Sequence, residues 1–341
     1  MLNTKIYLNS KIFDKKVEQI PTRQGYGEGL VAAGEIDENV VVLCADLTES
    51  TRSILFAEKF PDRFVEIGVA EQLLATIAAG MANYGKIPFI SSYAAFSPGR
   101  NWEQIRTTIA LNDVPVKIAG AHAGLTVGPD GATHQQLEDI ALMRAMPNMI
   151  VVVPCDSIEA KKATVAAAKN GKPTYLRFAR EKTPVMTTEK TPFEIGKAEV
   201  FWDGSPSTRS ARSGRPQVAV VACGPLVYEA LLAARQMEEN GIDSIVVNNH
   251  TIKPMDERTI IRVAKTTGAI VTVEEHQING GMGSAVAEVL SRNFPVPMEY
   301  IGMPNSFGES GQPDELLEKY GMKAHHIVEA AKRVIKRKLN F

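Results

Sequence analysis

Cysteine is scarce in this chain, and its scarcity limits what the protein can be. The 341 residues include three cysteines, Cys44, Cys155 and Cys223. The number is odd, no two are close in sequence, and each lies in or beside an apolar run. A disulfide framework or a zinc knuckle is therefore not expected. We predict buried, reduced thiols, which are typical of cytoplasmic proteins.

Long apolar runs and an excess of one charge are also missing. No stretch reaches the roughly 18 apolar residues that a membrane-spanning helix needs, and the N-terminal residues lack the compact apolar core of a signal peptide. The formal net charge is −1 at pH 7, which argues against a general attraction to nucleic acid or anionic lipid. We expect a cytoplasmic protein that binds neither.

Several common site motifs are absent or fail on closer reading. The sequence has no GxxxxGK[ST], HExxH or CxxC pattern, so no metal site is expected. GYGEG at 25–29 lacks the third glycine of a dinucleotide-binding fingerprint, and no strand is expected before it. GGMG at 280–283 follows an expected strand and opens an expected helix. There, a tight turn and close helix packing explain the glycines better than an anion site does.

What the chain does have is an alternation of short apolar runs and longer helical patterns. Strands are expected at 40–46, 86–92, 116–120, 149–155 and 173–180, and helices at 70–85, 101–112 and 157–171, the last of them capped by Ser157. The strands are continuously apolar, which is typical of parallel sheets covered by helices on both faces. We predict an α/β fold.

A second series of the same kind comes after a change in composition. Residues 203–216 are rich in Gly, Ser, Pro and Arg, which predicts an exposed loop. We divide the chain into an N-terminal extension at 1–20, one domain at 21–190 and a second at 191–341. Each domain is predicted to have three α/β/α layers with a mostly parallel sheet.

The most informative segment is VKIAGAHAGLTVGPDGATHQQLED at 116–139. His122 and His134 flank a glycine-rich stretch that contains Asp130. The pattern predicts a strand, a polar loop and then a helix from residue 135, which is where open α/β sheets place ligand crevices. Imidazole is suited to proton transfer near neutral pH, so we expect these three side chains in a functional site.

Two further segments have simple structural explanations when each is taken alone. Glu71 opens the apolar helix expected at 70–85, where the helix dipole favours an acid. Tyr93 and Phe96 lie in the small-residue loop SYAAFSPGR, where core packing is as good an explanation as ligand binding.

Taken together, the three segments resemble the pyrimidine-binding and C-terminal domains of transketolase. IGVAEQ matches that family's glutamate motif, SYAAFSPGR its aromatic loop, and HAGLTVGPDGATHQQLEDIALMRAMPNM its substrate loop. TIKPMD, VEEH, GGMG and FGESGQPDELLEKYG extend the resemblance over about residues 20–338. The domain that holds the cofactor diphosphate through a GDG motif, an asparagine and magnesium has no counterpart here. The chain therefore resembles the C-terminal subunit of a split transketolase.

The resemblance implies thiamine diphosphate as the cofactor and Glu71 as the residue that hydrogen-bonds N1′ of its aminopyrimidine. Such a carboxyl must be able to share a proton with a ring nitrogen. Burial among Ile67, Val69 and Leu73 would favour its protonated form. The protein would supply geometry and electrostatics, and the cofactor the organic chemistry.

Other cofactor contacts are implied by the same resemblance. Either Tyr93 or Phe96 would stack on the aminopyrimidine, because this loop has an aromatic residue at both positions. Asp46 matches a family aspartate close to the cofactor. The magnesium ion would be bound mainly by the partner subunit.

The resemblance also implies contacts to a sugar phosphate. His122 and His134 would face the sugar hydroxyls and carbonyl oxygen, and Asp130 would accept a hydrogen bond from the hydroxyl next to the ketose carbonyl. For the phosphate, the matching positions are Arg23, Ser50 and Arg180. Taken alone, either arginine is better explained by a surface ion pair.

The implied activity is transfer of a two-carbon ketol unit from a ketose phosphate to an aldose phosphate, as in the pentose phosphate pathway. It would require an N-terminal partner subunit in an α2β2 heterotetramer. One alternative is the β subunit of a 2-oxoacid dehydrogenase's thiamine-dependent component, which normally lacks THQQLED and the paired histidines. A deoxyxylulose-phosphate synthase fragment and a non-catalytic regulatory subunit are the others.

Overall fold

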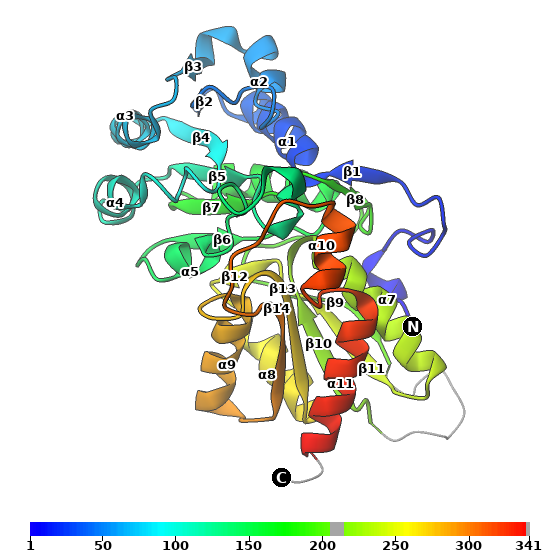
Figure 1. Cartoon of the computed structure of the whole chain (residues 1–341). Helices are drawn as coiled ribbons and strands as arrows, with labels where there is room; N and C mark the ends of the chain where they lie inside the picture. The colour runs from blue at the N-terminus through cyan, green and yellow to red at the C-terminus, as the bar shows by residue number, and fades with distance from the viewer. Residues whose placement is uncertain (205–214, 339–341) are drawn as a thin grey trace.

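The computed structural model describes residues 1–204 and 215–338. The chain forms two main sheets, each covered by helices, and Figure 1 shows the blue-to-green first half lying above the yellow-to-red second half. The prediction of an α/β fold with mostly parallel sheets is confirmed. Most of the loop expected at 203–216 lies outside the described residues.

The larger sheet belongs almost entirely to the first half of the chain. It has seven strands in the order β12-β6-β7-β5-β4-β2-β3. All neighbours are parallel except β12, which pairs antiparallel with β6. Its strands are β2 (Val40–Cys44), β3 (Phe64–Glu66), β4 (Ile87–Tyr93), β5 (Lys117–Ala121), β6 (Ile150–Val152), β7 (Thr174–Arg177) and β12 (Thr251–Lys253).

Helices cover both faces of this sheet. One face packs against α1 and α6 through an apolar cluster that includes Tyr26, Leu30 and Ala163. The other packs against α3 and η3, with Leu74 and Ile105 in the core. The helical elements of this half are η1 (Thr4–Ile6), α1 (Thr22–Ile36), α2 (Ile54–Lys59), η2 (Pro61–Arg63), α3 (Glu71–Asn83), α4 (Trp102–Gln104), η3 (Ile105–Ala110), η4 (Leu125–Asp130), α5 (Asp139–Arg144) and α6 (Ser157–Lys169).

The second sheet has five strands in the order β14-β13-β10-β11-β9, parallel except for β9 at the edge. Apolar residues of α7 and α11 pack on one face, and those of α8 and α9 on the other. The elements are β9 (Glu199–Asp203), β10 (Val218–Ala222), η6 (Gly224–Leu226), α7 (Val227–Glu239), β11 (Ser244–Asn248), α8 (Glu257–Thr267), β13 (Ile270–Gln277), α9 (Met282–Asn293), β14 (Met298–Met303), α10 (Pro313–Lys319) and α11 (Ala324–Lys338).

The two halves are joined by more than the chain between them. β12 lies in the second half of the sequence but completes the first sheet. At the N-terminus, the Asn3 N–H donates to the Phe201 carbonyl at 2.9 Å. A short antiparallel pair, β1 (Gln19–Pro21) with β8 (Lys182–Pro184), flanks the boundary. The division near residue 190 stays a prediction.

The glycines of GYGEG serve packing between α1 and its neighbours. A Cβ on Gly25 would lie 1.8 Å from the Ser157 carbonyl oxygen, and one on Gly29 would lie 2.6 Å from Thr164 Cβ. Only glycine lets α1 approach α6 this closely. A short strand, β1, does precede this helix, contrary to expectation, but the glycines lie inside α1 and not in a turn before it.

Three local expectations were wrong. The cap of α6 is Asp156, whose side chain accepts from the Glu159 N–H, and not Ser157. The helix expected at 101–112 is π-helical over Ile105–Ala110. Both end residues of that segment are buried, and the wider turn of a π-helix brings residues five apart onto one face. The helix expected from residue 135 begins at Asp139, because Gln136 forms a β-bridge with Ala123.

The expectations for cysteine and for membrane spans can also be compared with the structure. Cys44, Cys155 and Cys223 are free and buried, as predicted. Across residues 1–204 and 215–338, no helix is both long and apolar enough to cross a membrane.

Candidate active site

Three parallel strands bring the predicted site segments to one edge of the first sheet. In the register of the sheet, Cys44 of β2 lies beside Ser91 of β4, and Tyr93 of β4 beside Ala121 of β5. His122 comes directly after β5, and the loop containing Asp46 and Ser50 comes after β2. Carboxyl ends of parallel strands form the usual ligand crevice of such sheets.

Four rings from two predicted segments form one cluster at this edge. The rings of Tyr93 and His122 are stacked with centroids 3.9 Å apart, and those of Tyr93 and Phe96 are 6.1 Å apart. The His134 ring is edge-on to both aromatics, 6.4 Å from Tyr93 and 5.5 Å from Phe96. The structure therefore brings together the aromatic loop and both histidines.

His122 is held as a neutral imidazole. Its side chain is buried, and burial together with the charges of Arg23 and Arg180 and the neighbouring His134 lowers its pKa to about 3. Nδ1 has no hydrogen-bond partner among the described residues. Its backbone has φ 52°, a left-handed conformation that is uncommon outside glycine. A neutral ring with a free nitrogen is suited to hydrogen-bonding a ligand.

His134 is less enclosed. Its ring is half-buried, and Nδ1 lies 2.8 Å from the Thr133 hydroxyl. That contact fixes the ring orientation and leaves Nε2 available on the other side.

Glu71 opens α3 and is 2% exposed. Arg100 Nη1 donates to Glu71 Oε2 at 2.7 Å, and the Asn101 side-chain amide donates to the Glu71 carbonyl at 2.9 Å. The Arg100 guanidinium also lies 4.8 Å from the centre of the Phe96 ring. Arg100 thus connects the glutamate to the aromatic cluster, a role that the sequence reading missed.

The expected apolar surroundings of Glu71 were partly wrong. Val69 is 70% exposed and Leu73 50% exposed, while Ile67 is partly buried. Residues two apart on a helix point to opposite sides, so Leu73 cannot cover the Glu71 side chain. The Arg100 guanidinium contacts the carboxylate instead, while the Asn101 amide binds the main-chain carbonyl of the same residue.

Arg23 and Arg180 lie near His122, and Arg52 lies near Arg23. Arg23 Nη1 donates to the Ser50 carbonyl at 2.8 Å, and Arg180 Nη1 donates to the Val127 carbonyl at 2.9 Å and to Glu181 at 3.1 Å. Burial and then the charges of Arg52 and Arg180 lower the pKa of Arg23. Ser50 takes part through its main chain.

Arg52 is the member of this group that the sequence reading missed. Its backbone has φ 66° and packs against α1, since a Cβ on Gly27 would lie 2.5 Å from the Arg52 carbonyl oxygen. Gly27 is one helical turn beyond Arg23, so the two arginines share one side of α1. The Nε atoms of both are buried without a hydrogen-bond partner in the part of the chain that is described. Clustered cations without enough carboxylates favour an anionic ligand.

Two predicted residues lie apart from these contacts. Asp46 is exposed, and its backbone N–H donates to Glu66 Oε1 at 2.7 Å. Asp130 is exposed at the end of η4. The described contacts connect neither carboxylate to the histidines, so their roles stay predictions.

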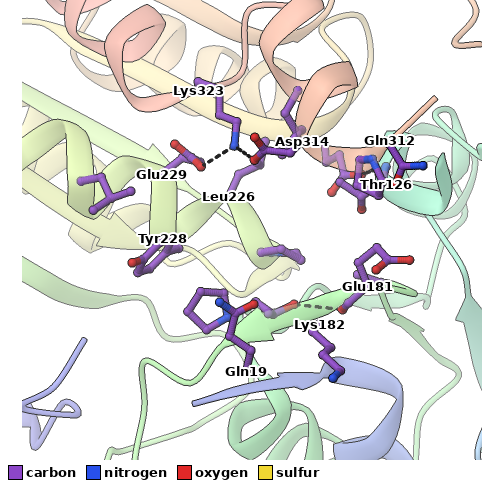
Figure 2. A pocket seen from close by; sticks show the side chains of 18 residues that line it. Gln19, Thr126, Glu181, Lys182, Leu226, Tyr228, Glu229, Gln312, Asp314 and Lys323 are labelled. Atoms are coloured by element: carbon purple, nitrogen blue, oxygen red, sulfur yellow. Dashed lines mark hydrogen bonds and ion pairs between the residues drawn. The ribbon is translucent and has the colours of Figure 1, made fainter. Parts of the chain in front are cut away.

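A cavity of about 640 Å³ lies on the far side of the His122–His134 loop, between the two halves of the chain. Its lining includes Thr126 and Glu275 but no member of the ring cluster. Figure 2 shows the Lys323 ammonium between the carboxylates of Glu229 and Asp314 at one wall. The cavity shares Glu181, the ion-pair partner of Arg180, with the candidate site and has no other residue of that site in its lining.

Two other features bear on ligand and metal binding. At GGMG, the backbone N–H groups of Met282 and Gly283 donate to Glu274 at 2.6 and 2.8 Å. The helix N-terminus is thus filled by the chain's own carboxylate, and close packing at these glycines is confirmed. Glu318, His325 and His326 place ligand atoms within 4.8 Å of one another at the surface, between α10 and α11 and away from the ring cluster. The expectation of no metal site stays a prediction.

Comparison with known proteins agrees with this arrangement. The family described as "Transketolase, pyrimidine binding domain" matches residues 18–186, and "Transketolase, C-terminal domain" matches residues 209–327. A "Putative transketolase C-terminal section" from Methanocaldococcus jannaschii is 44% identical, over 92% of this chain and 95% of the relative.

Two further similarities extend this picture. A "6-deoxy-6-sulfo-D-fructose transketolase subunit" from Clostridium sp. (strain MSTE9) is 37% identical, over 96% of this chain and 98% of the relative. A solved structure described as "Split gene transketolase, inactive beta4 tetramer" superposes with a TM-score of 0.85 at 42% identity, covering 94% of this chain and 99% of that one.

Proposed function

This chain belongs to the transketolase family as a C-terminal subunit, and we propose that it transfers a two-carbon ketol unit from a ketose phosphate to an aldose phosphate. It does so with an N-terminal subunit that carries the diphosphate-binding domain. The observation that supports this most is the single cluster of Tyr93, Phe96, His122 and His134, with Glu71 joined to it through Arg100.

Glu71 and Phe96 fit the aminopyrimidine of thiamine diphosphate. The Arg100 guanidinium, a planar group with N–H donors, already pairs with the Glu71 carboxylate at 2.7 Å and lies 4.8 Å from the Phe96 ring centre. A carboxylate beside an aromatic face therefore accepts a planar, N–H-bearing group here. The Arg100 side chain is 48% exposed, so it has room to move aside when a ligand takes its place at the carboxylate.

Of the two aromatic residues, we assign the stacking role to Phe96. One face of the Tyr93 ring is covered by His122, with centroids 3.9 Å apart. Tyr93 then serves to hold the His122 ring in place. Glu71 would hold the proton shared with N1′ of thiamine diphosphate, which when bound would supply a nucleophilic carbon for the ketose carbonyl.

The two histidines act on sugar oxygens. His122 stays neutral at pH 7, so it accepts or donates a hydrogen bond without bringing a charge. His134, oriented by Thr133, takes or returns a proton at a sugar hydroxyl as the carbon–carbon bond breaks or forms. Asp130 accepts from the hydroxyl next to the ketose carbonyl.

Arg23, Arg52 and Arg180, which we call the arginine group, bind the phosphate end of the sugar. Arg23 and Arg180 keep donors beyond those used on the Ser50 and Val127 carbonyls, and we add Arg52 as a third cation. Glu181 neutralises part of this charge, and the remaining positive charge suits a phosphate dianion.

The partner completes the cofactor site. We propose that magnesium and the diphosphate are bound mainly by the N-terminal subunit, in an α2β2 complex in the cytoplasm, and that this chain alone does not turn over substrate. A structurally similar protein is described as an inactive β tetramer, which supports the last point.

A reconstitution assay tests the proposal. The purified chain and its candidate partner, a subunit with a GDG motif, are mixed with a ketose phosphate donor and an aldose phosphate acceptor, with and without thiamine diphosphate. We expect transfer only when both subunits and the cofactor are present. Robust transfer by this chain alone, or decarboxylation of a 2-oxoacid in place of ketol transfer, would contradict the proposal.

A further inference from the structure

The loop between the two histidines needs external support. Gly124, Gly128 and Gly131 all have positive φ, between 73° and 97°. Glycine loses more conformational entropy on ordering than other residues do, so a loop this rich in glycine is not rigid by itself. The positions of His122 and His134 therefore depend on what the loop touches.

Gln135 is the side chain at the centre of that support. It is 4% exposed, and its Nε2 lies 3.1 Å from the Leu125 carbonyl oxygen and 3.3 Å from that of Gly128, both inside the loop. The same nitrogen lies 2.9 Å from the Glu309 carbonyl oxygen, in the segment before α10. The Gln135 amide thus contacts two positions within the loop and one in the second half of the chain.

Other residues of the second half of the chain also contact this loop. The Thr126 N–H donates to Glu275 Oε1 of β13. Pro313 of α10 lies 3.1 Å from where a Gly128 Cβ would be, and Ser310 Oγ lies 2.5 Å from the corresponding point at Gly131. These contacts come from the same side as the Gln135–Glu309 bond, and Figure 1 shows α10 at the boundary between the two sheets.

We propose that Gln135 is a positioning residue that fixes the His122–His134 loop to the second domain, and that fixing this loop is the second domain's part in the reaction. The inference rests on the proposed function for its catalytic consequence. The loop contacts themselves do not depend on it. No side chain of described residues 191–204 or 215–338 takes part in the ring cluster or the arginine group, so support is what this half contributes.

The chemistry of the contact requires a hydrogen-bond donor. Three carbonyl oxygens face Nε2, and an apolar side chain would remove this donor from all three, leaving the Gly128 carbonyl with the Gly131 N–H at 3.1 Å. Gln135 Oε1 has no hydrogen-bond partner among the described residues. It lies against Gly308, where a Cβ would come within 2.0 Å of it. Gly308 is therefore required for Gln135 to reach Glu309.

The first test compares Gln135→Met with Gln136→Met. Gln136 is the adjacent residue, half-buried, and its described contacts to the loop are made by the main chain. In the isolated chain, amide hydrogen exchange over residues 122–134 should rise about tenfold or more in Gln135→Met and stay at the parental rate in Gln136→Met. In the complex with its partner, kcat/KM should fall on the order of 10²-fold in Gln135→Met alone, with unchanged affinity for thiamine diphosphate.

Gly308→Ala tests the same contact from the second domain. Its Cβ would displace the Gln135 amide, so it should reproduce the exchange and kcat/KM changes. The double variant with Gln135→Met should add little, because both changes remove one contact.

Gln135→Glu should make protection of the loop depend on pH, which a side chain that only fills space would not do. A carboxylate facing three carbonyls repels them, whereas a protonated carboxyl again has a donor. Burial and those carbonyls favour the protonated form. The charged or titratable groups nearby are Glu275, whose carboxylate binds the Thr126 N–H, the Lys319–Glu309 pair, and His134. Loop protection, corrected for intrinsic exchange at each pH, should be lost at pH 8 and recover as pH falls towards 5.

Two results would overturn the proposal. One is parental loop exchange in Gln135→Met and Gly308→Ala. The other is an exchange rate in Gln135→Glu that does not change between pH 8 and 5. Failure of the proposed function would give a different result. The parental complex would then show no ketol transfer, while the hydrogen-exchange results on the isolated chain would still hold.

Discussion

The two halves of this chain contribute different things to one site. The first half supplies each described side chain of the ring cluster and of the arginine group. The second half reaches the site through a backbone carbonyl of Glu309, the Glu275 carboxylate and Pro313. Both have helix-covered, mostly parallel sheets, so the shared architecture alone does not tell which half carries chemistry.

The difference lies in the segments at the carboxyl ends of the strands. In the first half, β4 and β5 run into glycine-rich or small-residue loops that carry rings and histidines. In the second half, the end of β13 carries Glu274 and Glu275, which are used internally by a helix N-terminus and by the Thr126 amide. At this strand end the two buried carboxylates therefore hold backbone segments of the chain in place.

Replacing Glu71, the carboxyl that we propose faces the cofactor, should have the largest effect. Glu71→Gln keeps the shape of the side chain but cannot act as the proton-sharing acid, so kcat should fall by about 10²–10⁴-fold with the fold unchanged. Steady-state assays of the reconstituted complex measure this, with Glu58→Gln on exposed α2 as the matched control. Near-parental turnover in Glu71→Gln at unchanged cofactor affinity would remove Glu71 from the mechanism.

The histidines should come next. His122→Ala and His134→Ala should each lower kcat/KM by about 10²-fold, because each removes a proton-handling or hydrogen-bonding group at the sugar. Because the pKa of His122 is held at about 3, the His122→Ala variant should keep the parental pH profile of kcat/KM above pH 5. A loss of the acid limb in that variant would show that His122 titrates in the working range.

Substitutions in the arginine group should affect phosphorylated sugars more than unphosphorylated ones. Arg180→Gln should raise KM for phosphorylated sugars about 10- to 100-fold, since a charge-assisted contact contributes roughly 1.5–3 kcal/mol, and should change KM for unphosphorylated sugars little. Arg52→Gln should act in the same direction, with Arg52→Lys retaining part of the binding. Equal effects on both sugar classes would mean that these arginines are structural.

The smallest effect is on stability and concerns a histidine of the second half. Burial lowers the pKa of His250, like that of His122, to about 3, whereas an unfolded histidine titrates near about 6.5. Between these two pKa values the histidine is protonated in the unfolded chain and neutral in the folded chain. The free energy of unfolding therefore decreases as pH falls from about 6.5 towards about 3.

Urea midpoints of parental chain and His250→Gln between pH 7 and 4 measure this loss. The variant should lack about 1.4 kcal/mol per pH unit of the parental slope below pH 6, while His122 and the carboxyl groups with shifted pKa values contribute to both curves. Parallel curves would mean that His250 takes up its proton in the folded chain as readily as in the unfolded one.

Much of the fold and the core of the site could be predicted from sequence, for physical reasons that differ by residue. Continuous apolar runs such as 40–46 require a covered parallel strand, and the two histidines with Glu71 and the aromatic pair are chemically distinctive types in matching motifs. Arg52, Arg100 and Gln135 were missed because Arg and Gln are common at surfaces. Their importance comes from partners far away in sequence, 29 residues for Arg100 and Glu71 and 174 residues for Gln135 and Glu309. The π-helical turn at 105–110 was missed because its cause is tertiary packing.

The central claim is that Glu71 acts on the cofactor, while the His122–His134 loop, held by Gln135, acts on the sugar. Exchange of the thiazolium C2 proton in the reconstituted complex tests this claim most directly. The account predicts that exchange slows strongly in Glu71→Gln and stays near the parental rate in His122→Ala, His134→Ala and Gln135→Met. Loss of exchange in both histidine variants to the level of Glu71→Gln would show that the loop acts on the cofactor, and would contradict this division.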